Sequence, residues 1–389
     1  MISVQEALEK VIRTVQALDS VSVSVGNGVG FVLTEGVNAP IDMPPFDQSA
    51  MDGFALNMIE GNTYSLVGEI KAGDNSEHDL KPGQAVRIFT GAMVPIGANT
   101  VVKQEIVTTG NDSIKVNESI AIGQNIRPAG EQIHRNENAL RKGTYLNPGA
   151  IGYLATLGLD KINVYRKPKI TLIVTGDELI KPGVPLESGK IYESNSYTLQ
   201  AALRISGFEA KIKTVSDDYD STLRVIDDAI SSGDVVIITG GISVGDYDFV
   251  GAALSELNVT TDFYKVKQKP GKPLFFGHKE DKIIFALPGN PAAMLTCFYV
   301  YVLPALNKMM GKSDSFNQEK ELVLIDPYKK TSAMTHFLKA FAKDGKVQIS
   351  KSQSSAMLRT FIDSNCLLKL EQGREEWEIG DRVSVIMLP

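Results

Sequence analysis

Four short segments, each followed at once by glycine, hydroxyl or carboxylate side chains, constrain the fold of this chain more than any other feature. The clearest is 235–239 (VVIIT), a β-branched run typical of a strand buried on both faces. A helix is predicted just before it, at 221–232, and Gly233 suits the end of that helix. Two glycines, a serine and two aspartates follow the run: Gly240, Gly241, Ser243, Asp246 and Asp248.

The same arrangement recurs at 170–174, 210–215 and 283–287, where further strands are predicted. Because helices are expected between these runs, the pattern predicts one parallel sheet whose strands all end at the same edge. A cluster of turn, hydroxyl or acidic residues follows each run. The run 170–174 is followed by Thr175, Gly176, Asp177 and Glu178, and the run 210–215 by Ser216, Asp217 and Asp218. The run 283–287 is followed by Pro288, Gly289, Asn290 and Pro291.

That edge is where open α/β sheets bind their ligands. A tight turn with a capping aspartate would explain any single cluster. Several carboxylates gathered at one edge, however, repel one another unless a cation joins them. Glycines at the same edge let backbone N–H groups approach a phosphate. A phosphate–Mg²⁺ site therefore explains the set better than four unrelated turns.

Two neighbouring segments would complete this site. Residues 265–273 (KVKQKPGKP) gather cations around Gly271, so we expect Lys269 and Lys272 to bind phosphate or another oxyanion, with a solvated basic loop as the alternative. Residues 292–306 carry no charge, but the run is too short to span a membrane, and Pro304 is expected to interrupt its end. It predicts a buried core helix whose N-terminus points free N–H groups toward an anion.

Residues 44–56 (PPFDQSAMDGFAL) form a further informative segment, in which two prolines are followed by a polar turn and then by an apolar strand. Asp47 and Asp52 lie in this loop, where an aspartate either stabilises its own backbone or serves a site. Short β-rich runs with frequent glycines continue from 64 to about 131 and predict a small barrel or sandwich. Thr90 ends one of these runs.

The segments TGDEL, SDD, GGISVGDYD, KPGKP and LPGNP, in this order and together with PPFDQSAMDGFA, resemble the MoeA-like molybdopterin molybdenumtransferase family, to which the gephyrin E domain is related. The resemblance extends over nearly the whole chain. It implies a multidomain α/β plus β fold with a central parallel-sheet molybdopterin-binding domain at 167–311. It also implies a discontinuous N-terminal domain at 1–40 and 137–166, an inserted β-rich domain at 41–136, and a small β-barrel-like C-terminal domain at 319–389.

The resemblance further implies an enzyme that inserts molybdate into adenylylated molybdopterin, with Mg²⁺-dependent release of AMP. It implies a homodimer, with molybdopterin adenylyltransferase and molybdoenzymes as possible partners. The implied metal ligands are Glu178, Asp218 and Asp248, and Asp52 and Thr90 join them as catalytic residues. The implied substrate-binding residues are Thr175, Gly176, Asn195, Gly240, Gly241, Ser243, Lys269, Gly271, Lys272, Pro288, Gly289, Pro291 and Ser355.

Three positions depart from the family pattern. Gln132 replaces the usual Asp in NIRPAGEQ, so the role of that carboxylate is not carried over. Glu193 stands where Asp is usual, and Lys339 stands where Arg is common, which removes a planar bidentate donor. Two other functions are compatible with the central domain: the adenylyltransferase that makes the substrate, which usually lacks the 44–56 segment, and a non-catalytic molybdopterin-binding scaffold, against which the intact carboxylates argue.

Composition excludes several classes of function. With 40 basic and 46 acidic residues the net charge is −6, so the chain shows no electrostatic footprint for nucleic acid. The two cysteines, Cys297 and Cys366, lie far apart and form no disulfide framework, and the four histidines lack zinc-ligand spacing. Charged residues throughout the first twenty positions leave no signal-peptide core. We therefore expect a cytoplasmic protein without nucleic-acid or membrane partners.

Overall fold

The computed structural model describes residues 1–74, 78–242, 249–312 and 319–389. Two of the predicted site residues, Ser243 and Asp248, lie outside these ranges, as does Asp246. The described chain forms two compact units, one of residues 1–22, 30–34 and 163–389 and one of residues 23–29 and 35–162. The division into four domains that the sequence suggests is finer than this and stays a prediction.

A six-stranded sheet is the centre of the first unit. The four predicted strands are confirmed as parallel neighbours, and two antiparallel strands that the sequence pattern did not indicate extend the sheet. The strands at 275–279 and 282–287 follow each other directly in the sequence and form a tight hairpin. Glu280, in its turn, has a positive φ of 54°. The strand order is β16 (Ala210–Val215), β13 (Ile170–Thr175), β17 (Val235–Thr239), β21 (Lys282–Leu287), β20 (Phe275–Lys279) and β18 (Thr260–Tyr264).

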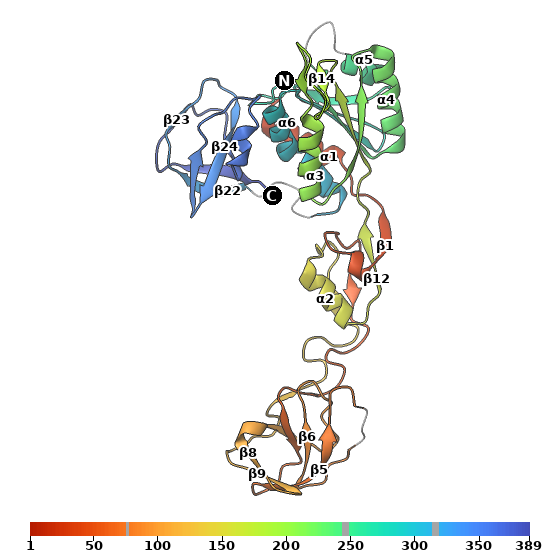
Figure 1. The fold of residues 1–389 in the computed structure, drawn as a ribbon, viewed down its shortest axis with the longest axis vertical. Coiled ribbons are helices and arrows are strands. Elements are labelled where there is room, and N and C mark those ends of the chain that lie inside the picture. The colour runs from red at the N-terminus through yellow and green to blue at the C-terminus, as the bar shows by residue number, and fades with distance from the viewer. Residues whose placement is uncertain (75–77, 243–248, 313–318) are drawn as a thin grey trace. The chain divides into compact units, whose positions relative to one another are not determined.

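Helices cover both faces of this sheet (Figure 1). Alternate strand side chains face opposite layers, so that Leu172 and Ile237 pack on one side while Ile173 and Ile238 pack on the other. One layer holds α1 (Val4–Thr14), α3 (Asn195–Ile205), α6 (Pro291–Cys297) and α7 (Leu303–Met309), and the other holds α4 (Tyr219–Ser232) and α5 (Phe249–Glu256).

The expected interruption at Pro304 is wrong, because the helix that starts at Pro291 continues to Met309. A π-helical segment, Phe298–Val302, joins α6 to α7 just before the proline. The wider π turn accommodates a residue that has no N–H to donate and whose ring would otherwise meet the preceding turn. This helix is long and apolar enough to cross a membrane, but 89% of its most apolar window is buried inside the protein, as in a core helix.

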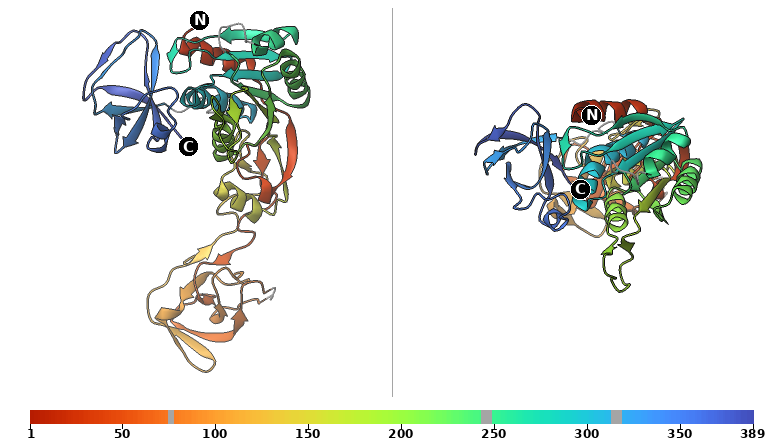
Figure 2. Two further views of the ribbon diagram at one scale, coloured as in Figure 1. Left: turned by 45° about the horizontal axis from the view of Figure 1, so that its top comes forward. Right: turned by 90° about the horizontal axis from the view of Figure 1, so that it is seen from above.

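The C-terminal part of the first unit is a closed barrel, which lies beside the sheet domain (Figure 2). The barrel closes because β24 pairs with both β25 and β26. A short strand of the preceding domain, β19 (Gln268–Lys269), adds to β24 in parallel. The barrel strands are β22 (Glu319–Leu324), β24 (Thr335–Lys343), β25 (Lys346–Ile349), β26 (Cys366–Leu370) and β28 (Arg382–Met387), with β23 (Tyr328–Lys329), β27 (Glu376–Trp377) and α8 (Arg359–Ile362) outside them.

The second unit is built on a mixed six-stranded sheet, and apolar clusters around Phe54 and around Val86 pack against this sheet. Its strand order is β7 (Thr100–Lys103), β4 (Gly53–Leu56), β6 (Gln84–Ile88), β5 (Thr63–Ile70), β9 (Ser113–Val116) and β8 (Val107–Thr109). The unit also contains the helix α2 (Pro148–Thr156), the pair β3 (Gln48–Ser49) with β10 (Ile126–Arg127), and the pair β2 (Val37–Asn38) with β11 (Asn138–Leu140).

Candidate active site

A cavity of about 640 Å³, here called the central cavity, opens at the carboxyl ends of β13, β17 and β21. The chain runs from β13 outward to β16 and then returns to the other side of β13 as β17, so β13 and β17 flank the switch point of the sheet. Eight of the predicted site residues line the cavity: Thr175, Glu178, Asn195, Gly240, Gly241, Pro288, Gly289 and Pro291.

Glycine is required at the end of β17. Gly240 and Gly241 have φ angles of 90° and 64°, a conformation that L-residues rarely adopt. A Cβ atom on Gly240 would also lie 2.6 Å from the carbonyl oxygen of Thr175. The glycines thus let two strand ends approach each other closely and keep the floor of the cavity free of side chains.

Asn195, which lines this cavity, carries a buried acceptor that is unpaired among the described residues. Its Nδ2 donates to Thr239 Oγ1 at 2.8 Å and to the carbonyl oxygen of Gly289 at 2.9 Å. Because a carbonyl only accepts, these bonds fix the orientation of the amide. Asn195 Oδ1 is buried and has no hydrogen-bond partner among the described residues. A buried amide oxygen is costly to leave unpaired, so it suits a ligand that carries an N–H or O–H donor.

The predicted metal ligands are in different situations. Glu178 lines the central cavity, and no described residue donates a hydrogen bond to its carboxylate. Asp218 instead caps α4, with one oxygen accepting from the Ser221 N–H at 2.9 Å and the other from Ser216 Oγ at 3.1 Å. The Ser221 hydrogen bond lowers the pKa of Asp218. Asp218 is not among the described residues that line the cavity, so its role as a metal ligand stays a prediction.

A second cavity of about 640 Å³, here called the lysine cavity, shares Pro273, Pro288 and Asn290 with the central cavity. Lys272 lies on it with an exposed ammonium group that has no partner among the described residues. Lys269 Nζ donates to Thr331 Oγ1 at 3.1 Å. The predicted residues that line this cavity are Lys269, Gly271, Lys272, Pro288 and Ser355.

The lysine-bearing loop is held from below by a buried polar network. Gln268 Nε2 donates to the carbonyl oxygen of Gly271 at 3.0 Å, and the hydroxyl of Tyr301, on the π-helical segment, donates to Gln268 Oε1. Gly271 has a φ of 83°, and a Cβ atom there would lie 2.5 Å from the sulfur of Cys297. Burial raises the pKa of the Cys297 thiol to about 12, so this cysteine packs and does not react.

The expectation that α6 offers free N–H groups to an anion is wrong. Pro291 has no N–H, and the amides of Ala292 and Ala293 both donate to the carbonyl oxygen of Ser355, at 3.0 and 3.1 Å. The loop that carries Ser355 therefore caps the helix. Asn290 Nδ2 donates to the Ser355 hydroxyl at 3.3 Å, which fixes this side chain at the boundary between the two cavities.

The second unit brings together two predicted residues, Asp52 and Thr90. The backbone N–H and the hydroxyl of Thr90 both donate to Asp52 Oδ1, at 2.8 and 2.9 Å, and these bonds, with the charge of Arg87, lower the pKa of Asp52. The second oxygen, Oδ2, has no partner among the described residues. The adjacent Gly53 admits no side chain, because a Cβ atom would lie 1.7 Å from the carbonyl oxygen of Val102.

Three family models cover most of the chain: the MoeA N-terminal region (domains I and II) at 2–158, a probable molybdopterin binding domain at 171–308, and the MoeA C-terminal region (domain IV) at 321–388. The chain is 31% identical over 399 residues to a molybdopterin molybdenumtransferase of Staphylococcus aureus, covering 99% of this chain and 95% of that one. A relative with the same name in Staphylococcus epidermidis is 32% identical over 402 residues, with equal coverage. The chain belongs to the molybdopterin molybdenumtransferase family.

A crystal structure of a molybdopterin biosynthesis MoeA protein from Pyrococcus horikoshii is similar over 100% of both chains, with a TM-score of 0.83 and 29% identity. A molybdenum cofactor biosynthesis protein from Pyrococcus furiosus, 20% identical with a TM-score of 0.63, shares the fold. The family and the fold class predicted from the motifs are thus confirmed, including the C-terminal barrel.

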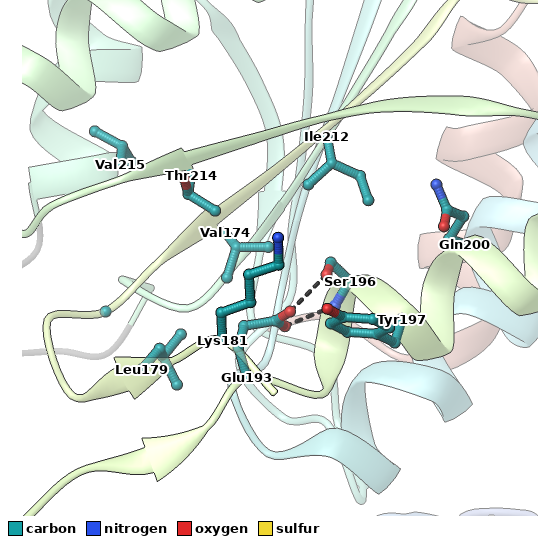
Figure 3. Close-up of a pocket in the computed structure, with 11 residues that line it drawn as sticks. Val174, Leu179, Lys181, Glu193, Ser196, Tyr197, Gln200, Ile212, Thr214 and Val215 are labelled. Atoms are coloured by element: carbon teal, nitrogen blue, oxygen red, sulfur yellow. Dashed lines mark hydrogen bonds between the residues drawn. The ribbon is translucent and has the colours of Figure 1, made fainter. Parts of the chain in front are cut away.

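The structure shows the surroundings of the residues at which this member of the molybdopterin molybdenumtransferase family departs from the family pattern. Lys339 is buried, and its Nζ donates to the carbonyl oxygens of Ser354 and Met357 at 3.0 and 3.4 Å, which ties the Ser355 loop to the barrel. Burial lowers the pKa of Lys339. Glu193 is also buried and accepts from the N–H and the hydroxyl of Ser196, at 2.7 and 2.5 Å (Figure 3). Gln132 lies on an exposed loop.

His336, which sequence reasoning set aside with the other histidines, lines the lysine cavity of this family member. Its ring nitrogens lie 3.1 Å from the Tyr328 hydroxyl and 2.9 Å from Ser332 Oγ. Burial, with the nearby charges of Lys269 and Lys330, lowers the pKa of His336 to about 4. No sequence signal could have found it, because β24 reaches this cavity only through its pairing with β19.

Proposed function

We propose that this chain inserts molybdate into adenylylated molybdopterin, with Mg²⁺-dependent release of AMP, to give the molybdenum cofactor. The observation that carries the proposal is the pair of adjoining cavities. The central cavity has glycines at its floor and is lined by Glu178, and the lysine cavity contains Lys269 and Lys272. The two cavities share Pro288 and Asn290. Such a pair suits a reaction in which an oxyanion must meet a phosphate-bearing substrate.

Lys272, with its unpaired ammonium group, attracts molybdate into the lysine cavity, and Lys269 adds a second positive charge. The Ser355 hydroxyl offers a further hydrogen bond to the oxyanion. His336 remains neutral at physiological pH and so leaves the net charge of this cavity to the lysines. Asn195 Oδ1, at the central cavity, accepts from a donor on the molybdopterin substrate.

The described carboxylates suit Mg²⁺ only together with further ligands that the substrate supplies. Within 1–74, 78–242, 249–312 and 319–389, no group of three or more His, Cys, Asp or Glu side chains is placed so that it could hold a metal ion by itself. Mg²⁺ commonly binds through one or two carboxylates plus substrate phosphates. We propose that Glu178 supplies one such carboxylate, with Asp248 and Asp218 as the other predicted ligands. A bound Mg²⁺ would neutralise charge as the bond between the two phosphates breaks.

The test is turnover of adenylylated molybdopterin by the purified chain. We expect release of AMP that requires both molybdate and Mg²⁺. Formation of adenylylated molybdopterin from ATP would instead identify an adenylyltransferase. Tight binding without turnover in the presence of both ions would identify a scaffold. Either of these two outcomes would contradict the proposal.

We further propose that the chain acts as a cytoplasmic homodimer in which Asp52 and Thr90 serve the active site. The support is the family resemblance at PPFDQSAMDGFA and the unpaired Oδ2 of Asp52. Molybdopterin adenylyltransferase, as the source of the substrate, and molybdoenzymes, as recipients of the product, are the proposed protein partners.

A further inference from the structure

Three side chains of the C-terminal barrel form a hydrogen-bonded chain that leads to the lysine cavity. Ser332 Oγ lies 2.9 Å from His336 Nε2, and the Tyr328 hydroxyl lies 3.1 Å from His336 Nδ1. Tyr328 and His336 line the lysine cavity, whereas Ser332 does not. Ser332 is half-buried between Thr331 and Ala333, which are exposed. The chain therefore has one end near solvent and the other end in the cavity where the oxyanion is proposed to bind.

The chemistry of these three groups allows a proton to pass along the chain. A hydroxyl both donates and accepts, and a neutral imidazole carries one N–H and one lone pair. When Ser332 gives a proton to Nε2 of His336, the ring can pass the proton on Nδ1 to the oxygen of Tyr328. The hydroxyl proton of Tyr328 can then leave into the cavity. One proton is transferred, and no side chain of the chain keeps a charge.

The surroundings of His336 favour this neutral form of the ring. His336 is only 1% exposed, and its burial and the charges of Lys269 and Lys330 lower its pKa. Lys269 is the residue directly opposite His336 in the pairing of β19 with β24. A protonated ring would retain the proton that it accepts, whereas a ring that favours the neutral form releases it. Two hydroxyl partners are also what a buried histidine with a purely structural role would have, so an experiment must separate the two roles.

The reaction at the lysine cavity consumes protons, and this step rests on the proposed function. Molybdate and a dithiolate, each with two negative charges, take up two protons to give water and a trioxo-molybdenum dithiolate with two negative charges. Two Mo–S bonds form, the bond from molybdenum to one oxygen breaks, and molybdenum remains Mo(VI). The departing oxygen leaves as water, so two protons must reach it.

The other side chains of this cavity do not provide those protons. Among the described residues that line it there is no Asp or Glu. Lys269 and Lys272 would each lose the positive charge that binds the oxyanion if they gave up a proton. We infer that Ser332, His336 and Tyr328 relay protons from solvent to the oxyanion during molybdenum insertion. Tyr328 gives the proton to the departing oxygen, and the other two residues act through it.

The test compares the rate of molybdenum insertion at saturating molybdate with the Kd of molybdate, measured by titration calorimetry on the full chain. His336→Gln and Tyr328→Phe interrupt the relay but keep a polar group or a ring in place. We expect kcat to fall about 100-fold in both variants, as when a positioned proton donor is lost, with the Kd of molybdate within about 2-fold of the wild type. Ser332→Ala should lower kcat less, because a water molecule can replace a hydroxyl near solvent.

His278→Gln and Ser364→Ala are the matched controls. His278 Nδ1 lies 2.8 Å from Asp262 Oδ2, and Ser364 Oγ lies 2.9 Å from Ser350 Oγ, so each substitution disturbs a polar pair of the same kind. Neither residue lines the lysine cavity. Both controls should have the kcat of the wild type. Thermal unfolding checks that every variant is folded.

A rescue experiment separates a relay from a structural role. His336→Ala leaves a space beside Tyr328 that a free imidazole molecule can enter. We expect added imidazole to raise the kcat of His336→Ala about 10-fold, because it replaces the missing proton carrier. Imidazole should not raise the kcat of His336→Gln, in which the longer side chain fills this space.

The kcat of the wild type in either His336→Gln or Tyr328→Phe would overturn the inference. Weaker molybdate binding with unchanged kcat would show a role in binding and would also overturn it. So would a loss of kcat that imidazole does not restore in folded His336→Ala, since it would show a structural role. Absence of turnover by the wild type contradicts the proposed function and removes the reaction that the relay serves. Normal turnover in a relay variant contradicts the inference alone.

Discussion

At the residue scale, Lys272 is the most direct test of the lysine cavity. We expect Lys272→Ala to weaken molybdate binding by about 1–3 kcal/mol, the range for a hydrogen bond to a charged group, because its ammonium is exposed and unpaired in the described chain. The measurement is the molybdate dependence of AMP release. Lys343→Ala, at the exposed end of β24, is the control for loss of one positive charge. If the half-saturating molybdate concentration equals that of the wild type, Lys272 binds no molybdate and lies in a solvated loop.

His336 should give the protein a measurable sensitivity to acid. Its pKa is about 4 in the folded protein and about 6.5 in an unfolded chain, so between these values the unfolded chain binds more protons. Stability is therefore lost as the pH falls from about 6.5 to about 4, by a total of about 3 kcal/mol. His336→Gln can keep one of the hydrogen bonds to Tyr328 and Ser332 but does not titrate.

Urea unfolding from pH 7 to pH 4 is the measurement. We expect the free energy of unfolding of His336→Gln to fall less steeply over this interval than that of the wild type. The comparison within each protein removes any constant difference caused by the substitution. Parallel curves for the two proteins would mean that His336 is protonated as easily in the folded state as in the unfolded state.

At the scale of elements, the lysine-bearing loop depends on Gly271. Gly271→Ala should cost well over the about 1–2 kcal/mol of a left-handed L-residue, because the added methyl group would also meet the sulfur of Cys297. Gly345→Ala is the control, since Gly345 has a similar φ of 76° and nothing within 4 Å of the added atom. Urea unfolding measures both variants. Equal losses of stability would show that the loop moves aside without cost.

The central elements could be predicted from the sequence because their signals are local. The run 235–239 is apolar and β-branched, and the glycines after it need a positive φ, so both strand and turn follow from neighbouring residues. The lysine cavity could not be predicted in this way. Its walls come from 268–273, 288–293 and 328–355, which the parallel pairing of β19 with β24 and the cap from Ser355 to α6 bring together. Long-range pairing of this kind has no local sequence signal.

At the scale of the whole molecule, each unit has the apolar clusters needed for a core of its own. The proposed active-site residues are nevertheless divided between them, with Asp52 and Thr90 in the second unit and Glu178 and Lys272 in the first. No motif in the sequence links the two groups. A homodimer offers one way for both groups to act in a single reaction, since two equivalent sites can each draw on both chains.

Mixed dimers test this. At a molybdate concentration well below the half-saturating value, Asp52→Asn and Lys272→Ala chains should each have low activity alone. If each site takes Asp52 from one chain and Lys272 from the other, a mixed dimer has one doubly altered site and one intact site. Random exchange at equal amounts makes about half of the dimers mixed, so AMP release should recover to about a quarter of the wild-type rate per chain. If both residues of a site come from the same chain, every site in the mixed dimer carries one substitution. No recovery would then be seen even with mixed dimers verified by mass spectrometry, and sharing of the site between chains would be excluded.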